Sequence, residues 1–279
     1  MSTINGRNVL ITGAAHGIGK LMAGMVASHG GNLILCDVNG PGLEATAKEL
    51  SRPEVNISTY LLDISDREAV YSVSDRIHKE VGKVDILINN AGVVFTGEIL
   101  DLPDDKHLKQ VEVNLLGTLW MIKAFVPPMV KRNEGHIVTV ASSTGTLAMP
   151  GMGIYSATKH ALMGLNEALR NELYNSGARR VRTTVICPYA IATGMFEGIK
   201  TPFFSPPLKP EAMARAIIRS IRRNRSYLAK PFIVYLPPIL KALLPPVVTD
   251  ISLRIMGFNR SIYSCRGFQR KQNRPIEHG

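Results

Sequence analysis

Short apolar runs rich in β-branched residues recur along the first two-thirds of the chain, and longer segments with a helical pattern separate them. The strand-like runs cover residues 8–13, 32–37, 57–63, 85–91, 136–142 and 181–188, and clear helical segments cover 17–30 and 66–82. Strands that are apolar on both faces and joined by helical crossovers are typical of a parallel sheet covered on both sides. The pattern therefore predicts an α/β fold with a doubly wound, Rossmann-like, mostly parallel sheet and helices on both faces.

The alternation stops near residue 200, where a Pro-rich stretch interrupts it. Beyond it, residues 210–223 have the pattern of a helix and residues 232–237 that of a possible last strand, followed by an apolar, Pro-rich stretch and a basic terminus. We expect residues 209–279 to extend the domain formed by residues 1–208 rather than to form a second one.

Charge is distributed unevenly between these two parts. Residues 1–208 hold 19 Lys and Arg against 19 Asp and Glu, whereas residues 209–279 hold 14 against 3 and so carry the whole net charge of +11. Prolines and Lys241 interrupt the apolar stretch 231–258, so a membrane span is not expected there. Three interpretations stay open for this tail: peripheral contact with an anionic membrane, packing over a substrate cleft, and contact with another subunit. It contains no recognisable nucleic-acid-binding module, and no nucleic-acid partner is expected.

The first residues lack a basic start followed by an apolar run, which argues against a secretory signal. Cys36, Cys187 and Cys265 are odd in number, far apart and without a CxxC motif. We expect them to be buried, reduced thiols in a cytoplasmic protein, and we expect no metal site.

Three glycines, Gly13, Gly17 and Gly19, fall between the first predicted strand and the first predicted helix. A tight strand-to-helix turn needs glycine, and the N-terminus of the helix then offers N–H groups and a favourable dipole to a pyrophosphate. Residues 1–208 are therefore expected to be a dinucleotide-binding domain. Asp37 ends the second strand, where a carboxylate accepts hydrogen bonds from ribose hydroxyls and repels a 2′-phosphate, so NAD is favoured over NADP.

Tyr155 and Lys159 stand at i and i+4, on one face of a predicted helix. An ammonium near a phenol, like a positive nicotinamide ring, favours the phenolate and would bring the tyrosine pKa down from about 10 toward neutrality. Ser142 ends the fifth strand, at the sheet edge where ligands bind, and its hydroxyl can hold the oxygen of an alcohol or carbonyl. These groups could carry acid–base chemistry on an alcohol.

The glycine loop, which reads TGxxxGxG, resembles that of the short-chain dehydrogenases/reductases in their non-extended branch. The motif NNAG at 89–92, the spacing of Ser142 to Gly145, and the order of Asn114, Ser142, Tyr155 and Lys159 match the same family over roughly residues 5–200. The resemblance implies reversible hydride transfer at a carbinol carbon. In it Ser142 orients the substrate oxygen, Tyr155 moves the proton, Lys159 lowers the tyrosine pKa and holds the nicotinamide ribose, and Asn114 supports a water relay; an asparagine satisfied by backbone groups is the alternative for Asn114.

The resemblance also implies a set of cofactor-binding residues. Asp63 would lie near the adenine, although a cap at the end of its strand is an alternative role, and His16 stands where NADP-preferring relatives often carry a basic residue. The family usually has Pro-Gly after the sixth strand, whereas here Tyr189 follows Pro188, which puts the local backbone geometry in question and places Tyr189 in the substrate wall. The expected cofactor contacts are Gly13, His16, Gly17, Ile18, Gly19, Asp37, Asp63, Ile64, Asn90, Ala91, Gly92, Tyr155, Lys159, Pro188, Ile191 and Thr193.

Residues after Thr193 resemble the branch that contains retinol dehydrogenases and 17β-hydroxysteroid dehydrogenases. That likeness implies a small lipophilic substrate, a retinoid, steroid or long-chain alcohol. The apolar residues Met195, Phe196, Phe203 and Phe204 suggest a lid over such a substrate, and structural packing within the protein is the alternative role for them. The likeness also implies a homodimer or homotetramer formed through the helices around 159–173. The main hypothesis is an NAD(H)-dependent oxidoreductase; the alternatives are an NADPH-dependent carbonyl reductase and a cofactor-binding scaffold without turnover.

Overall fold

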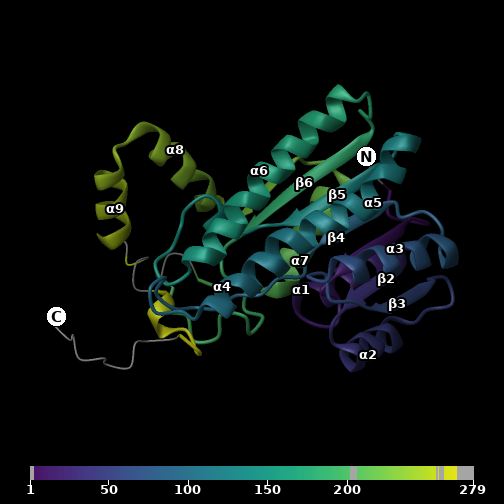
Figure 1. Cartoon of the computed structure of the whole chain (residues 1–279), viewed down its shortest axis with the longest axis horizontal. Helices are drawn as coiled ribbons and strands as arrows, with labels where there is room; N and C mark the ends of the chain where they lie inside the picture. Colours follow the sequence, from purple (N-terminus) through teal and green to yellow (C-terminus); the bar gives the residue numbers. More distant parts are fainter. Residues whose placement is uncertain (1–2, 202–205, 256, 258–260, 269–279) are drawn as a thin grey trace.

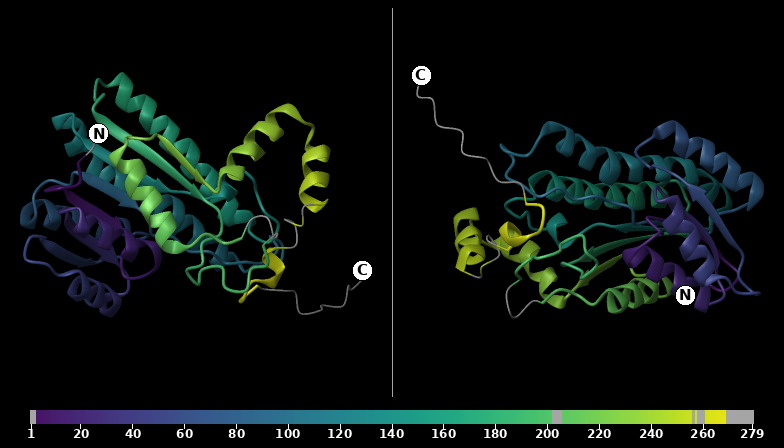
Figure 2. Two further views of the ribbon diagram at one scale, coloured as in Figure 1. Left: turned by 180° about the vertical axis from the view of Figure 1, so that it is seen from behind. Right: turned by 90° about the horizontal axis from the view of Figure 1, so that it is seen from below.

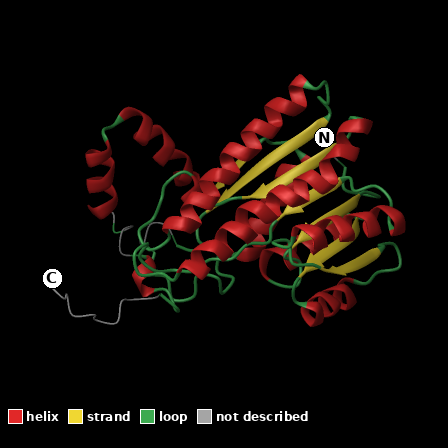
Figure 3. Ribbon diagram, in the orientation of Figure 1, coloured by secondary structure: helices red, strands yellow, loops and turns green. Residues whose placement is uncertain are grey.

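A seven-stranded parallel sheet forms the centre of the molecule in a computed structural model, which describes residues 3–201, 206–255, 257 and 261–268. The strand order is β3-β2-β1-β4-β5-β6-β7, and every neighbouring pair is parallel. Figure 3 shows helices on both sides of this sheet, which confirms the doubly wound α/β prediction. The strands are β1 Asn8–Thr12, β2 Asn32–Asp37, β3 Ile57–Leu61, β4 Ile86–Asn89, β5 Gly135–Val140, β6 Val181–Pro188 and β7 Tyr227–Lys230.

The crossover helices divide between the two faces of the sheet because successive strand residues point to opposite sides. Val9 and Ile11 of β1 pack into one core with α1, α2 and α7, whereas Leu10 packs into the other core with α3, α5 and α6. The helices are α1 Gly17–Ser28, α2 Gly40–Leu50, α3 Arg67–Glu80, α4 Asp104–Val111, α5 Thr118–Arg132, α6 Gly153–Asn175, α7 Pro210–Arg222, α8 Leu236–Leu243 and α9 Pro246–Ile255.

One segment between α4 and α5 departs from α-helical geometry: Glu112–Gly117, named η1, is a π-helix. The continuous helical stretch Asp104–Arg132 that contains it is long and apolar enough to cross a membrane. Half of its most apolar window is buried in this protein, where α5 packs against α3, β4 and β5. We therefore assign it as a helix of the core.

The last strand differs from the prediction. Residues 232–237 were expected to be a strand, but Phe232–Tyr235 form a short 3-10 helix, η3, that runs into α8, and the seventh strand is Tyr227–Lys230. Proline explains the difference, because Pro231, Pro237 and Pro238 have no N–H to donate to a ladder, and a proline in the first turn suits the start of a helix.

The residues after β7 form an arm that stands apart from the sheet. Figure 1 shows α8 and α9 beside the main body, and both views in Figure 2 place them at the same end of the molecule. In the described part of this segment, α8 packs chiefly against η3 and α9. We call residues 232–255 the C-terminal arm.

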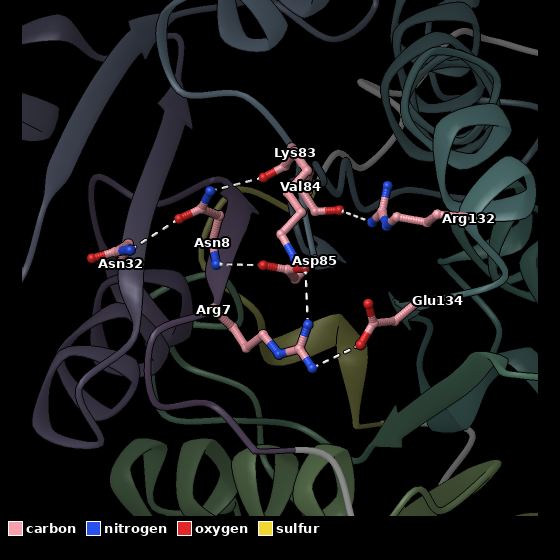
Figure 4. Close-up of polar contacts among 8 residues, drawn as sticks. All are labelled: Arg7, Asn8, Asn32, Lys83, Val84, Asp85, Arg132 and Glu134. Carbon is pink, nitrogen blue, oxygen red and sulfur yellow. Dashed lines mark hydrogen bonds and ion pairs between the residues drawn. The ribbon is translucent and has the colours of Figure 1, made fainter.

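A network of charged side chains fastens the opposite end of the sheet, where the strands begin (Figure 4). Buried Asp85 accepts hydrogen bonds from the guanidinium of Arg7 at 3.2 Å and from the backbone N–H of Asn8 at 3.0 Å. Arg7 also donates to Glu134 at 2.8 Å. The network therefore joins the entries to β1, β4 and β5.

The three cysteines are buried as free thiols, as the sequence predicts. Cys36 lies on β2 and Cys187 on β6, so both thiols are packed within the sheet layers. Burial raises the pKa of Cys36 to about 12 and that of Cys187 to about 11, which keeps both thiols protonated and unreactive at neutral pH.

Candidate active site

The residues predicted for the site gather in one cavity of about 650 Å³ beyond the carboxyl ends of β1, β2, β4, β5 and β6. A doubly wound sheet binds ligands at this edge, because the strand order reverses there and the crossing helices leave a crevice. Of the predicted residues, the cavity wall holds Gly13, His16, Gly17, Ile18, Gly19, Asp37, Asp63, Ile64, Asn90, Ala91, Gly92, Ser142, Tyr155, Lys159, Pro188, Ile191 and Thr193. Asn114 does not line the cavity.

The N-terminus of α1 opens into this cavity. Gly17 is the first residue of α1, and neither His16 nor another described side chain caps the helix. Uncapped N–H groups at the positive end of a helix dipole suit an anion. The α1 terminus therefore fits the phosphates of a dinucleotide.

The glycine loop is tied tightly to the end of β4. A Cβ on Gly19 would stand 1.9 Å from the carbonyl oxygen of Gly13, so only glycine fits there. The hydroxyl oxygen of Thr12 accepts from the backbone N–H groups of Asn90 and Ala91, both at 3.0 Å. The Asn90 amide donates back to the carbonyl oxygen of Thr12 at 2.9 Å. Thr12 and Asn90 thus fix the shape of the loop, and the predicted set did not include Thr12.

Asp37 lies buried at the end of β2 with its carboxylate held in place by backbone groups. One oxygen accepts from the N–H of Ala15 at 2.9 Å and the other from the N–H of Asn39 at 3.0 Å. Two carboxylate oxygens offer about four acceptor positions, so the group can accept further hydrogen bonds from hydroxyls. No basic side chain follows it, because Val38 and Asn39 are next.

The carboxylate of Asp63 is already bound within the protein. It accepts from the hydroxyl of Ser65 at 2.6 Å and from the ammonium of Lys109 at 3.2 Å. Burial works to raise the pKa of Asp63, but the hydrogen bonds from Ser65 and Lys109 outweigh it and hold the pKa below its usual value. These contacts agree with the alternative role of Asp63, a cap at the end of its strand. Lys109 of α4 also lines the cavity. It was not among the predicted site residues, because no motif in its helix marks it as part of the site.

Tyr155, Ser142 and Lys159 come together from α6 and the end of β5. The Lys159 ammonium lies 5.5 Å from the centre of the Tyr155 ring and donates to the carbonyl oxygen of Val140 at 3.0 Å. Ser142 caps the short helix that follows β5 and also forms a hydrogen bond with Tyr155. The edge of the Phe196 ring faces Tyr155 at 6.1 Å between ring centres.

The pKa of Tyr155 differs in direction from the sequence-based expectation. Burial raises it to about 12, and the hydrogen bond with Ser142 opposes this only in part. Burial also lowers the pKa of Lys159 to about 8. Both shifts have the same origin, because an apolar surrounding disfavours the charged form of each group. In the protein alone, the phenol is therefore protonated at neutral pH.

Asn114 sits in the π-helix η1, fully buried, and its amide is satisfied by backbone groups. Its carbonyl oxygen accepts from the N–H of Val93 at 2.8 Å, and its NH₂ donates to the carbonyl oxygen of Val93 at 2.9 Å. The alternative interpretation of Asn114 thus agrees with these contacts. Gly92 lies between this amide and Lys159, since a Cβ there would stand 3.1 Å from the Asn114 oxygen and 3.6 Å from the Lys159 nitrogen.

The backbone at Tyr189 does not adopt a left-handed conformation. The described residues with positive φ other than glycine are Asn133 and Asn224, so the missing glycine after Pro188 causes no such strain. The N–H of Tyr189 donates to the carbonyl oxygen of Lys230 at 2.8 Å, which ties this turn to β7. The Tyr189 side chain lines two adjoining cavities.

The second cavity, of about 140 Å³, begins at Ser142 and is almost entirely apolar. We call it the apolar cavity. Its walls come from the loop after β5, from residues 189–199, from the C-terminal arm and from residues 261–262. Phe196 lines it and Met195 lines the first cavity, whereas Phe203 and Phe204 lie outside the described residues. No single stretch of sequence predicts this assembly, because its walls are far apart along the chain. Two of its parts were nevertheless expected, since Phe196 was assigned to an apolar lid and packing over a substrate cleft was one interpretation of the tail.

Residues 7–202 match the family model for short chain dehydrogenases. The chain belongs to the short-chain dehydrogenases. It is 42% identical over 247 residues to epidermal retinol dehydrogenase 2 of Mus musculus, with 87% of this chain and 79% of the relative covered. It is 37% identical to mouse 17-beta-hydroxysteroid dehydrogenase 13, with 86% and 78% covered.

Solved structures of short-chain dehydrogenases share the fold. A short chain dehydrogenase/reductase from Burkholderia phymatum in complex with NAD aligns with a TM-score of 0.78 at 28% identity, covering 91% of this chain and 97% of that one. An alcohol dehydrogenase from Thermococcus sibiricus complexed with 5-hydroxy-NADP aligns with a TM-score of 0.70 at 27% identity, covering 80% and 95%. This short-chain dehydrogenase is thus an oxidoreductase that acts on a CH–OH group with a nicotinamide dinucleotide.

Proposed function

We propose that this enzyme interconverts an alcohol and its ketone or aldehyde on a lipophilic substrate of the retinoid, steroid or long-chain alcohol class, with NAD(H) as the cofactor. The observation that carries the proposal is the junction at Ser142, which lines both the polar cavity and the apolar cavity. A hydroxyl at this junction can hold the reacting oxygen while the apolar body of the substrate lies against apolar walls. Relatives named as retinol and 17β-hydroxysteroid dehydrogenases support the same substrate class.

Each reacting group has a role that follows from its environment. Ser142 orients the substrate oxygen, and the protonated phenol of Tyr155 donates its proton to that oxygen during carbonyl reduction. In alcohol oxidation Tyr155 takes the proton back, and the Lys159 ammonium, 5.5 Å from the ring centre, favours the phenolate that accepts it. When bound, the nicotinamide cofactor supplies or accepts the hydride at the carbinol carbon.

Asn114 acts on this chemistry through the backbone. It pairs with both polar groups of Val93 and so holds the chain that passes Lys159. We propose that the N-terminus of α1 binds the phosphates of the cofactor and that Lys159 binds the nicotinamide ribose. Asp63 and Ile64 would contact the adenine. The nicotinamide carboxamide would be contacted by Pro188, Ile191 and Thr193. These residues line one cavity, which supports the assignment.

NAD is the preferred cofactor in this proposal because of Asp37. Its buried carboxylate can accept from the two ribose hydroxyls, and a 2′-phosphate at that place would meet a like charge without a compensating Arg or Lys at positions 38 and 39. His16 is exposed in the glycine loop, at a position where NADP-preferring relatives often carry a basic residue, and a positive charge there would favour NADP instead.

We further propose that the enzyme is a cytoplasmic homodimer or homotetramer that contacts membranes peripherally. Closed symmetry is the usual arrangement of soluble oligomers, and α6 is the helix we expect at the interface. Residues 1–208 and 209–279 are proposed to act as one domain, since α7 packs on α1 and β7 extends the sheet beside β6.

The substitution Tyr155→Phe tests the proposed function. Turnover of retinoids, steroids and long-chain alcohols, followed by the absorbance of reduced cofactor, should fall by about 10³-fold because the proton donor is gone. Fluorescence titration of the variant should still show binding of NADH, and weaker binding of NADPH. Tyr174→Phe, an exposed tyrosine on the same helix, is the matched control and should keep full activity. Normal turnover by Tyr155→Phe would remove Tyr155 from the mechanism.

A further inference from the structure

The C-terminal arm is apolar on both its inner and its outer surface. Leu240 of α8 lines the apolar cavity, whereas Leu243, on the same helix, is 74% exposed and does not line it. No residue of α8 is buried. A surface helix normally has one apolar stripe that faces the protein and a polar face toward water. The outer face of the arm therefore presents apolar residues where a surface helix normally has polar ones.

Exposed apolar side chains recur along both helices of the arm. Isolated exposed apolar residues are normal on a protein surface, whereas a contiguous set marks an interaction site. Figure 1 shows α8 and α9 side by side at one end of the molecule. The most exposed of these residues are Phe232 at 83% and Ile255 at 81%, and the group consists of Phe232, Ile239, Leu243, Val247, Ile251 and Ile255.

Charge and length favour a membrane surface as the partner. Lys241 and Arg254 of the arm outnumber Asp250, so the arm itself carries a small positive net charge. Basic and apolar side chains together suit an anionic bilayer, where the apolar face enters the headgroup region. Because α8 has 8 residues and α9 has 10, each is too short to span about 30 Å of hydrocarbon and would lie in the interface.

We propose that the outer face of the C-terminal arm seats on an anionic phospholipid bilayer and that substrate passes from this bilayer into the apolar cavity beneath α8. The inference rests on the proposed function for the identity of the substrate. The inner and outer faces of α8 are one helix diameter apart, about 10 Å, so a seated arm brings the lipid phase next to the cavity. A lipophilic alcohol then reaches Ser142 and Tyr155 without crossing water.

Lys241 lies at the rim of the apolar cavity, on the exposed side of α8. It is the one charged residue in the described lining of the apolar cavity, and its ammonium donates to the carbonyl oxygen of Thr146 at 3.4 Å, a long and weak hydrogen bond. Its exposed position on α8 allows the ammonium to pair with a lipid phosphate at the rim while its apolar stem stays against the cavity.

The double substitution Leu243→Asp with Ile255→Asp tests the seat without touching the cavity walls. In flotation with vesicles of phosphatidylcholine and about 30% phosphatidylserine, vesicle binding should fall by about 100-fold, or tenfold for each charge placed in the interface. Oxidation of a vesicle-embedded long-chain alcohol should fall with it, while oxidation of a water-soluble short alcohol should stay within about twofold of wild type. Leu100→Asp, at a leucine 94% exposed outside the arm, is the control and should leave vesicle binding unchanged.

The outcomes separate the two proposals. Unchanged vesicle binding by the double variant would overturn the proposed membrane contact. The proposal would also fail if the wild type did not bind vesicles and the double variant changed its oligomeric state in size-exclusion chromatography, because the outer face would then join copies of the chain. Vesicle binding that depends on the arm, together with no turnover of any alcohol, would retain the seat and reject the proposed function. Tyr155→Phe should bind vesicles like the wild type.

Discussion

Lys159 shows at the scale of one residue how a reacting group costs stability. Burial lowers the pKa of its ammonium from 10.5 to about 8, so at pH 7 the folded protein holds a charge in an apolar setting. The hydrogen bond to the carbonyl oxygen of Val140 offsets part of this cost. A residue selected for stability alone would be uncharged here, which supports a role in the reaction.

The variant Lys159→Met should therefore lose activity and gain stability. At pH 7 we expect its free energy of unfolding to exceed that of the wild type by about 1–2 kcal/mol, because the desolvated charge is removed. The gain should shrink between pH 8 and 10, since the folded wild type releases the proton near pH 8 and the unfolded chain only near 10.5. Urea denaturation at several pH values measures it, with Lys131→Met on the surface of α5 as the control. Lower stability of Lys159→Met at pH 7 would contradict this account.

At the scale of an element, β5 contains a histidine that is kept neutral. His136 is buried, and its Nε2 lies 2.7 Å from the hydroxyl oxygen of Thr184. That hydroxyl donates to the carbonyl oxygen of Arg225, so Nε2 must carry the proton that it shares with Thr184. Burial first, and the charge of Arg182 second, lower the pKa of His136 to about 4.

Acid should therefore destabilise the protein through β5. Between about pH 6.5 and 4 the unfolded chain binds a proton that the folded His136 does not, so stability falls as the pH decreases, by at most about 3 kcal/mol. In His136→Gln this part of the loss should disappear, which thermal unfolding across that pH range can measure. His29→Gln, on an exposed histidine after α1, should unfold like the wild type. Equal acid sensitivity in His136→Gln would show that another group is responsible.

Elements also show what could be predicted from the sequence and what could not. Five of the six predicted strands were predictable because they are buried almost throughout and their apolar runs are continuous, whereas β3 is a largely exposed edge strand. The glycine loop and Tyr155 with Lys159 were predictable because each lies within a short segment. The pKa of Tyr155 was not predictable, because a sequence lists neighbours and not the depth of burial that outweighs them. The π-helix around Asn114 depends on tertiary packing, so no local pattern predicted it. For the apolar cavity, the sequence indicated a lid that includes Phe196 and left the tail over the cleft as one interpretation, but how these distant segments meet depends on tertiary packing.

At the scale of the whole molecule, Asp85 joins segments that are distant in the chain. Its carboxylate contacts Arg7 and Asn8 at the start of β1, and Arg7 continues the network to Glu134 before β5. The Asp85 side chain is 4% exposed, so its carboxylate depends on these partners in place of water. The network thus stabilises the end of the sheet that lies away from the site.

The variant Asp85→Ala should lower the free energy of unfolding by about 3 kcal/mol, because it leaves the Asn8 N–H and part of the Arg7 guanidinium unpaired. Glu68→Ala, which breaks the fully exposed pair with Arg67, should leave the free energy of unfolding nearly unchanged, because water screens such a pair. Chemical denaturation of both variants provides the comparison. If the two losses were equal, the network would have no special stabilising effect. The kcat of the folded Asp85→Ala enzyme should remain that of the wild type, since the site lies at the other end of the strands.

The π-helix at Glu112–Gly117 has a consequence for how this enzyme can change length over evolution. A π-helical turn contains one residue more than the α-helical turn it replaces, so it behaves as a one-residue insertion kept in place by packing. Loss of a single residue there would restore α-geometry and leave α4 and α5 in nearly the same register, whereas the same loss within α4 or α5 would turn one helix against the other by about 100°. The lost position would come from the turn that directs Asn114 at Val93. We therefore expect this segment to accept the loss of one position more readily than the helices on either side of it, at the expense of the contact between Asn114 and Val93.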